Sequence, residues 1–82
     1  MNTKIDVIKA IRLINKYKSD KSDTISGEAW LNLMQYVDET TLLHLGCMKV
    51  TRLNKTHWEF PYRYIEEDKK EKILKRMFPE DV

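Results

Sequence analysis

The chain of 82 residues contains few of the residues that form crosslinks and turns: it has one cysteine, two glycines and two prolines. Its single cysteine, Cys47, excludes an internal disulfide and predicts a reducing, cytoplasmic setting. The scarcity of glycine and proline argues against long irregular linkers. Because a chain of this length suffices for one domain but not for two, we expect a single domain over residues 1–82.

Signatures of catalysis and of membrane insertion are also missing. No apolar run approaches the roughly 20 residues that a spanning helix needs. No glycine-rich phosphate loop, nucleophile motif or pair of carboxylates on an apolar face occurs. His44, Cys47 and His57 are potential metal ligands, but a structural zinc site needs four, and no fourth is evident. We therefore predict a non-enzymatic protein with no cofactor, no metal and no membrane partner.

What the chain does contain is charge, unevenly distributed. Charged residues make up 34% of the sequence, and the net charge is +2. Residues 26–46 carry Glu28, Asp38 and Glu39 with no lysine or arginine, whereas residues 1–25 and 47–64 both have an excess of basic residues. An acidic segment thus lies between two basic ones, which constrains the choice of binding partner.

Apolar residues recur at helical spacing in the first half of the chain. A helix is predicted over residues 4–18, capped by Thr3 with Asp6 in its first turn and followed by a loop, "KSDKSDT". Thr24-Ile25 predicts a short extended segment, after which Ser26 can cap a second helix. Its core-facing stripe is Ala29, Trp30, Leu33, Met34 and Val37.

A third, short helix is expected between Asp38, as its N-cap, and Gly46, which suits the left-handed position that ends helices. Leu42 and Leu45 should face the core. The outward positions would then be Thr40, Thr41, Leu43 and His44.

From Cys47 the apolar period changes to two, which predicts a hairpin with a turn at Asn54-Lys55-Thr56. Its second strand would carry four aromatic residues on one face: Trp58, Phe60, Tyr62 and Tyr64. Because Pro61 cannot donate a ladder hydrogen bond, it should lie at a bulge or beyond the paired part of the sheet. The final stretch, "IEEDKKEKILKRMF", has acids first and bases last, as a helix prefers, and its charges are explained as a solvated helix face.

Helix, loop, helix, short helix, hairpin and helix is an order that resembles the winged-helix superfamily. The segment "LLHLGCMKVTRLNKTHWEF" is similar to the junction of that superfamily, in which a recognition helix precedes a two-stranded wing. The resemblance covers about residues 4–64. It implies a small α+β, winged-helix-like domain, with helices packed on a two- or three-stranded antiparallel sheet and a C-terminal helix.

The resemblance also implies roles for particular residues in DNA binding. Those that would approach base edges are Thr40, Thr41 and His44. Those that would reach phosphates are Lys49, Arg52, Lys55 and His57. The physical difficulty is that the second and third helices have no lysine or arginine, while Asp38 and Glu39 would have to approach phosphates.

The aromatic strand has two interpretations. Its rings could form a stacking platform for single-stranded RNA, or they could cover the core, which a small domain needs more. Near the end of the strand, exposed Tyr62 and Tyr64 beside Arg63 would suit a protein interface.

The first hypothesis for function is a small regulator or inhibitor that binds another protein, of the kind that phages and mobile elements encode. Its basis is the opposite charge of the acidic helical segment and the basic hairpin. The alternative is a winged-helix DNA-binding transcriptional regulator, dimeric through its first or last helix. In that case DNA would meet the basic wing and the first helix.

Overall fold

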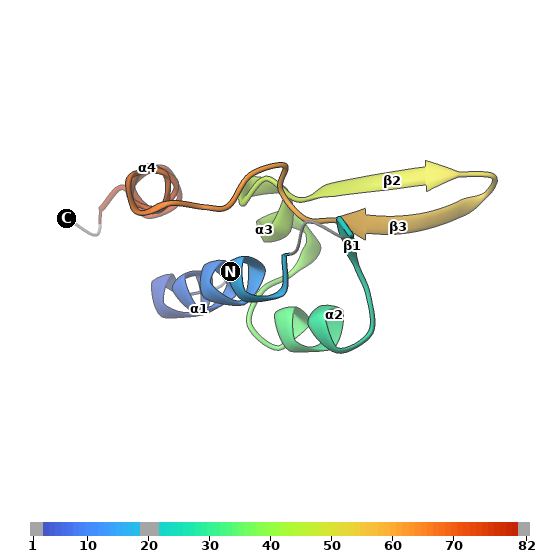
Figure 1. Ribbon diagram of the computed structural model, residues 1–82. Coiled ribbons are helices and arrows are strands. Elements are labelled where there is room, and N and C mark those ends of the chain that lie inside the picture. The colour runs from blue at the N-terminus through green and yellow to red at the C-terminus, as the bar shows by residue number, and fades with distance from the viewer. Residues whose placement is uncertain (1–2, 19–21, 81–82) are drawn as a thin grey trace.

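The computed structural model describes residues 3–18 and 22–80, which form an α+β domain of four helices and a three-stranded antiparallel sheet (Figure 1). The helices are α1 (Lys4–Tyr17), α2 (Gly27–Met34), α3 (Glu39–His44) and α4 (Glu67–Met77). The strands are β1 (Thr24–Ile25), β2 (Met48–Arg52) and β3 (Lys55–Glu59), in the order β1-β3-β2. The expected fold class, with its C-terminal helix, is confirmed.

Helix α1 begins at the predicted cap. The Thr3 side chain accepts a hydrogen bond from the Asp6 backbone, and the Asp6 carboxylate accepts one from the Thr3 backbone. Its buried stripe consists of Val7, Ala10, Ile11 and Ile14. Part of the loop predicted after it, residues 19–21, lies outside the described residues.

Helices α2 and α3 begin after the predicted cap positions, but α2 ends at Met34, so Val37 is buried outside the helix in which it was expected. Asp38 caps α3 by accepting a hydrogen bond from the Thr41 backbone at 2.8 Å, and Leu42 and Leu45 are fully buried. The prediction that Thr41 faces outward is wrong, because Thr41 is only 6% exposed. Its neighbour is the C-terminal end of α4, which lines a common groove with Thr41.

Gly46 ends this helical region with a backbone φ of +98°. An added Cβ there would lie 3.4 Å from the Cβ of Pro61, so the position requires both a positive φ and close approach. Pro61 itself is buried and follows the end of β3, beyond the paired part of the sheet as predicted.

Strands β2 and β3 form a hairpin that projects away from the helices (Figure 1). Its turn consists of Leu53 and Asn54, both with positive φ, whereas the predicted turn also included residues 55 and 56. That prediction is wrong because Lys55 pairs with Arg52, and Thr56 pairs with Thr51, in the ladder. The extended segment Thr24–Ile25 is confirmed as β1, which pairs with the other side of β3.

The four aromatic residues do not share one strand face. Trp58 and Phe60 are buried, at 6% and 4% exposed, but Tyr62 is 87% and Tyr64 46% exposed. The strand ends at Glu59, so the alternation that would have turned all four rings inward stops before Pro61. The prediction that the aromatic rings cover the core is therefore confirmed for Trp58 and Phe60 only.

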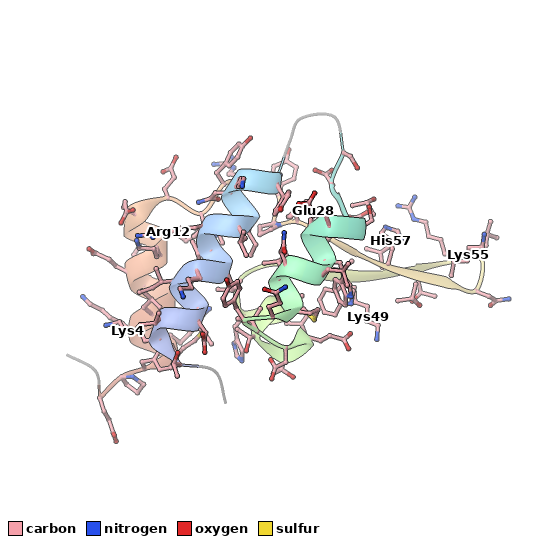
Figure 2. All side chains as sticks on the ribbon, turned by 90° about the horizontal axis from the view of Figure 1, so that it is seen from below. Lys4, Arg12, Glu28, Lys49, Lys55 and His57 are labelled. Carbon is pink, nitrogen blue, oxygen red and sulfur yellow. The ribbon has the colours of Figure 1, made fainter. Side chains whose placement is uncertain are left out.

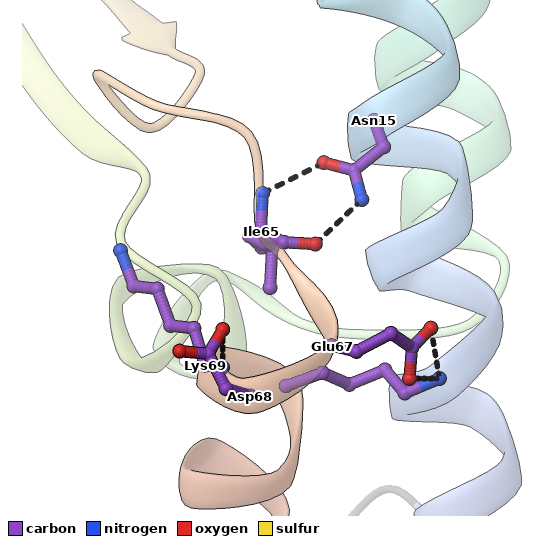
Figure 3. Close-up of polar contacts among 6 residues, drawn as sticks. Asn15, Ile65, Glu67, Asp68 and Lys69 are labelled. Carbon is purple, nitrogen blue, oxygen red and sulfur yellow. Dashed lines mark hydrogen bonds and ion pairs between the residues drawn. The ribbon is translucent and has the colours of Figure 1, made fainter.

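A pair of hydrogen bonds fastens the segment between β3 and α4 to helix α1. The Asn15 side chain donates to the Ile65 carbonyl and accepts from the Ile65 backbone N–H, both at 2.9 Å (Figure 3). Ile65 is buried, and α4 then contributes Ile73 and Leu74 to the core. Helix α4 is thereby held at the end of the domain opposite the hairpin, with α3 between them (Figures 1 and 2).

Candidate macromolecule-binding site

The residues predicted to bind a macromolecule lie in three separate places. One group is on the hairpin: Lys49, Arg52, Lys55 and His57. A second is on α3: Thr40, Thr41 and His44. The third is in the segment after β3: Tyr62, Arg63 and Tyr64. The structure therefore does not bring all of them to one surface.

The hairpin residues divide between the two faces of the sheet, because directly paired residues share a face. Lys49 pairs with Trp58, so it lies on the face toward the helices. His57 pairs with Val50, and Arg52 pairs with Lys55, on the other face. Lys49 and His57 therefore lie on opposite faces of the hairpin and cannot both contact a partner that docks on one face.

Lys49 and His57 are also engaged within the protein, near the base of the hairpin (Figure 2). The Lys49 ammonium lies 3.8 Å from a Glu39 carboxylate oxygen, which also accepts a hydrogen bond from the Trp58 indole at 3.1 Å. His57 Nε2 lies 3.0 Å from the Glu59 carboxylate. Lys49 thus links the hairpin to α3, whereas His57 bonds within β3. Because both side chains already have a partner, we do not count either as available to bind an anion.

The hairpin tip, residues 52–55, is different. Arg52, Leu53, Asn54 and Lys55 are all exposed, and Leu53 is 96% exposed. Neither Arg52 nor Lys55 has a carboxylate partner within the described part of the chain. Two like charges directly opposite each other disfavour the free hairpin, and an anion between them would relieve that repulsion.

On α3, the outward face is smaller than predicted. Thr40 and His44 are exposed, but between them lies Leu43, at 57% exposure, and Thr41 is buried. This face offers a hydroxyl, an imidazole and an apolar side chain. It can therefore make few contacts with base edges.

A basic stripe on α4, which the sequence interpretation missed, lies beside α3. It consists of Lys69, Lys72 and Arg76, which line one groove with Leu43, His44 and Gly46. The Arg76 guanidinium donates a hydrogen bond to the His44 carbonyl at 3.2 Å, and no carboxylate among the described residues pairs with Lys69 or Lys72. The spacing of these bases, at i, i+3 and i+7, was the available signal.

The segment after β3 forms a surface of mixed charge beside the end of α1. Tyr64 donates a hydrogen bond to the Lys18 carbonyl at 3.3 Å, and the Lys18 ammonium lies 5.7 Å from the centre of the Tyr64 ring. Tyr62 and Arg63 line a hollow there together with Asp23, Glu66 and Asp68. Lys18 and Lys69 also line the hollow, so its three bases and three acids balance and it attracts a polyanion only weakly.

Cys47 is 2% exposed, and burial raises the pKa of its thiol to about 12. A thiol that stays protonated is a poor nucleophile and a poor metal ligand. Within residues 3–18 and 22–80, no three histidine, cysteine, aspartate or glutamate side chains gather as a metal site would require.

No protein-family model, curated protein or solved structure matches the chain. Among the described helices, none is long and apolar enough to cross a bilayer.

Proposed function

We propose that this chain is a non-enzymatic, winged-helix DNA-binding regulator. The element order from α1 to β3 and the sheet order β1-β3-β2 support the winged-helix assignment, with α3 as the recognition helix and β2–β3 as the wing. Because one fold hosts many functions, the proposal rests on the site.

The observation that carries the proposal is the placement of free cations on both sides of α3. The α4 stripe lies on one side and the hairpin tip on the other, with α3 between them in both views (Figures 1 and 2). The five residues of β2 place the tip about 13 Å beyond the base of the hairpin, so the tip cations can reach a phosphate backbone that lies well to one side of α3. This arrangement suits two phosphate backbones flanking a helix.

Two of the three acidic residues that favoured a protein partner have roles within the protein. Asp38 caps α3, and Glu39 bonds to Trp58 and pairs with Lys49. Among the described residues, only the charge of Glu39 is compensated by a nearby cation. The proposal of a DNA partner therefore rests on the basic side chains that flank α3.

The chemistry of α3 limits the expected specificity. Thr40 and His44 can hydrogen-bond to base edges, and Leu43 can contact a thymine methyl group. No arginine, asparagine or glutamine is present in α3 for a two-point contact with a purine. Most of the affinity should accordingly come from phosphates, which makes it steeply dependent on salt.

The test is a salt titration of binding to duplex DNA by the purified chain. Lys72→Ala should weaken binding and reduce the slope of log affinity against log salt by about 1, the effect of one lost phosphate contact. The matched control is Lys75→Ala, on the same helix but outside the groove beside α3, which should change the slope little. Equal effects of the two variants, or no binding at low salt, would contradict the proposal.

A protein-binding regulator remains the second candidate because of Leu43. This exposed leucine lies beside a groove between α3 and α4 whose lining includes Met77 and Phe78. Leu43→Lys would add a cation to α3, so it should strengthen DNA binding but abolish an apolar protein contact. Size-exclusion chromatography of the purified chain distinguishes the two candidates. The absorbance ratio of the eluted peak detects bound nucleic acid, and its mass detects a bound protein.

A further inference from the structure

The turn at the hairpin tip contains an unfavourable residue. Leu53 and Asn54 have φ values of +49° and +64°. Two-residue turns with both φ values positive favour asparagine followed by glycine, and a bulky non-glycine residue rarely adopts a positive φ. Asparagine or glycine at position 53 would form the same turn with less strain.

Few contacts within the described structure compensate for this strain. Leu53 is 96% exposed, and the neighbouring Thr51 and Thr56 are exposed as well. The hydroxyls of Thr51 and Thr56 share a hydrogen bond at 3.1 Å across the strands, but this bond leaves the Leu53 side chain without cover. Arg52 and Lys55 face each other across the strands without a described carboxylate partner. The tip thus combines strain, like-charge repulsion and an exposed apolar side chain, and local strain of this kind is concentrated at functional sites.

We propose that Leu53 is a wedge that enters the minor groove of bound DNA and partly unstacks a base step, while Arg52 and Lys55 contact the flanking phosphates. This inference rests on the proposed function and deepens it, because it makes the protein one that bends DNA. Apolar side chains inserted between base steps kink the duplex, and narrow minor grooves attract arginine and lysine.

The chemistry of the tip favours DNA over other partners. A bilayer surface is bound by a broad apolar face, whereas the tip presents one apolar side chain. The minor groove is about 6 Å wide, too narrow for a helix or a two-stranded ribbon, but it can admit a single side chain that projects from the end of a hairpin. Steps such as TA and TG, which unstack easily, should be preferred.

The experiment uses the full chain and a duplex of about 20 base pairs. The duplex contains several TA steps, donor and acceptor dyes at its ends, and 2-aminopurine beside the steps. Leu53→Asn keeps both cations and accommodates the positive φ, whereas Leu53→Met keeps an apolar side chain. We expect the wild type and Leu53→Met to raise both energy transfer and 2-aminopurine emission. Leu53→Asn should bind with an unchanged salt slope but produce neither signal.

The outcomes separate the two proposals. If the wild type binds no duplex at low salt, the proposed function and the wedge fail together. If it binds with a salt-dependent affinity but gives neither signal, or if Leu53→Asn gives the same signals as the wild type, only the wedge is overturned. Leu53-dependent binding to phosphatidylserine vesicles without DNA bending would also overturn it, because the apolar tip would then serve a lipid surface.

Discussion

The two halves of the hairpin share one continuous ladder but have opposite surroundings. In the inner half, Trp58 is buried, lies 6.0 Å from the Trp30 ring and donates to Glu39. In the outer half, every residue from Thr51 to Thr56 is exposed. The inner half is therefore stabilised by side-chain packing as well as by backbone pairing, whereas the outer half depends mainly on the pairing.

This difference separates structural from functional charge. Lys49 and His57, in the inner half, pair with Glu39 and Glu59. Arg52 and Lys55, in the outer half, have no such partner among the described residues. A basic residue on this hairpin is thus a candidate for the proposed DNA contact only where no described carboxylate already neutralises it.

Replacing Trp58 should have the largest effect on stability. Trp58→Ala would remove a large buried ring and leave a cavity, so we expect a loss of about 3 to 5 kcal/mol in the free energy of unfolding. Thr56→Ala, two residues away on the same face of the same strand, removes an exposed hydrogen bond to the Thr51 hydroxyl and should cost no more than about 1 kcal/mol. Chemical denaturation followed by circular dichroism measures both values.

Because a loss of that size can unfold a small domain, Trp58→Phe provides a milder variant. It retains an aromatic ring but removes the donor to Glu39, and we expect a loss between those of the other two variants. A Thr56→Ala variant as unstable as Trp58→Phe would contradict the division of the hairpin into two unequal halves.

Two of the sites with positive φ, Gly46 and the hairpin tip, should show a smaller contrast in stability. Gly46, beside buried Pro61, should lose about 1 to 2 kcal/mol of stability on mutation to alanine, because its φ of +98° disfavours any side chain. At the tip, Asn54→Gly should change stability by no more than about 0.5 kcal/mol, since both residues accommodate this turn. Thermal melting of the two variants tests the contrast, and a larger effect at the tip would be contrary to it.

Local signals explain why most elements could be predicted from sequence. The cap at Thr3, the cap at Asp38 and the glycine after α3 each act within a few residues of where they occur. The turn was misplaced for the same reason: Lys55 and Thr56 look like turn residues, and nothing local predicts that Leu53 adopts a positive φ. The exposure of Tyr62 and Tyr64 was expected, but their place on one strand face with the other two rings was wrong, because β3 ends at Glu59.

The candidate site was less predictable because it depends on contacts between distant segments. The acidic charge of Glu39 could not be assigned to Lys49 and Trp58 until the hairpin was placed over α3. The bases of α4 were attributed to a solvated face, since the sequence does not show which helix face lies beside α3. The exposed cations on the tip were predicted, because no neighbouring element is needed to leave them exposed.

The last prediction concerns the N-cap of α3, the helix whose Glu39 bonds to Trp58 in the inner half of the hairpin. Hydrogen bonds from the Thr41 backbone and side chain lower the pKa of Asp38 below its ordinary value of 3.8. Because the folded-state pKa is the lower one, the ionised carboxylate stabilises the fold fully above that ordinary value, and this contribution is lost as the pH falls through the folded-state pKa. Asp38→Asn can still cap the helix, and it should lose less stability than the wild type when the pH is lowered from neutral to below 3.8. Asp38→Ala should already be less stable than the wild type at neutral pH. Denaturation curves over this range measure the difference, and parallel curves for Asp38→Asn and the wild type would show that the cap does not depend on ionisation.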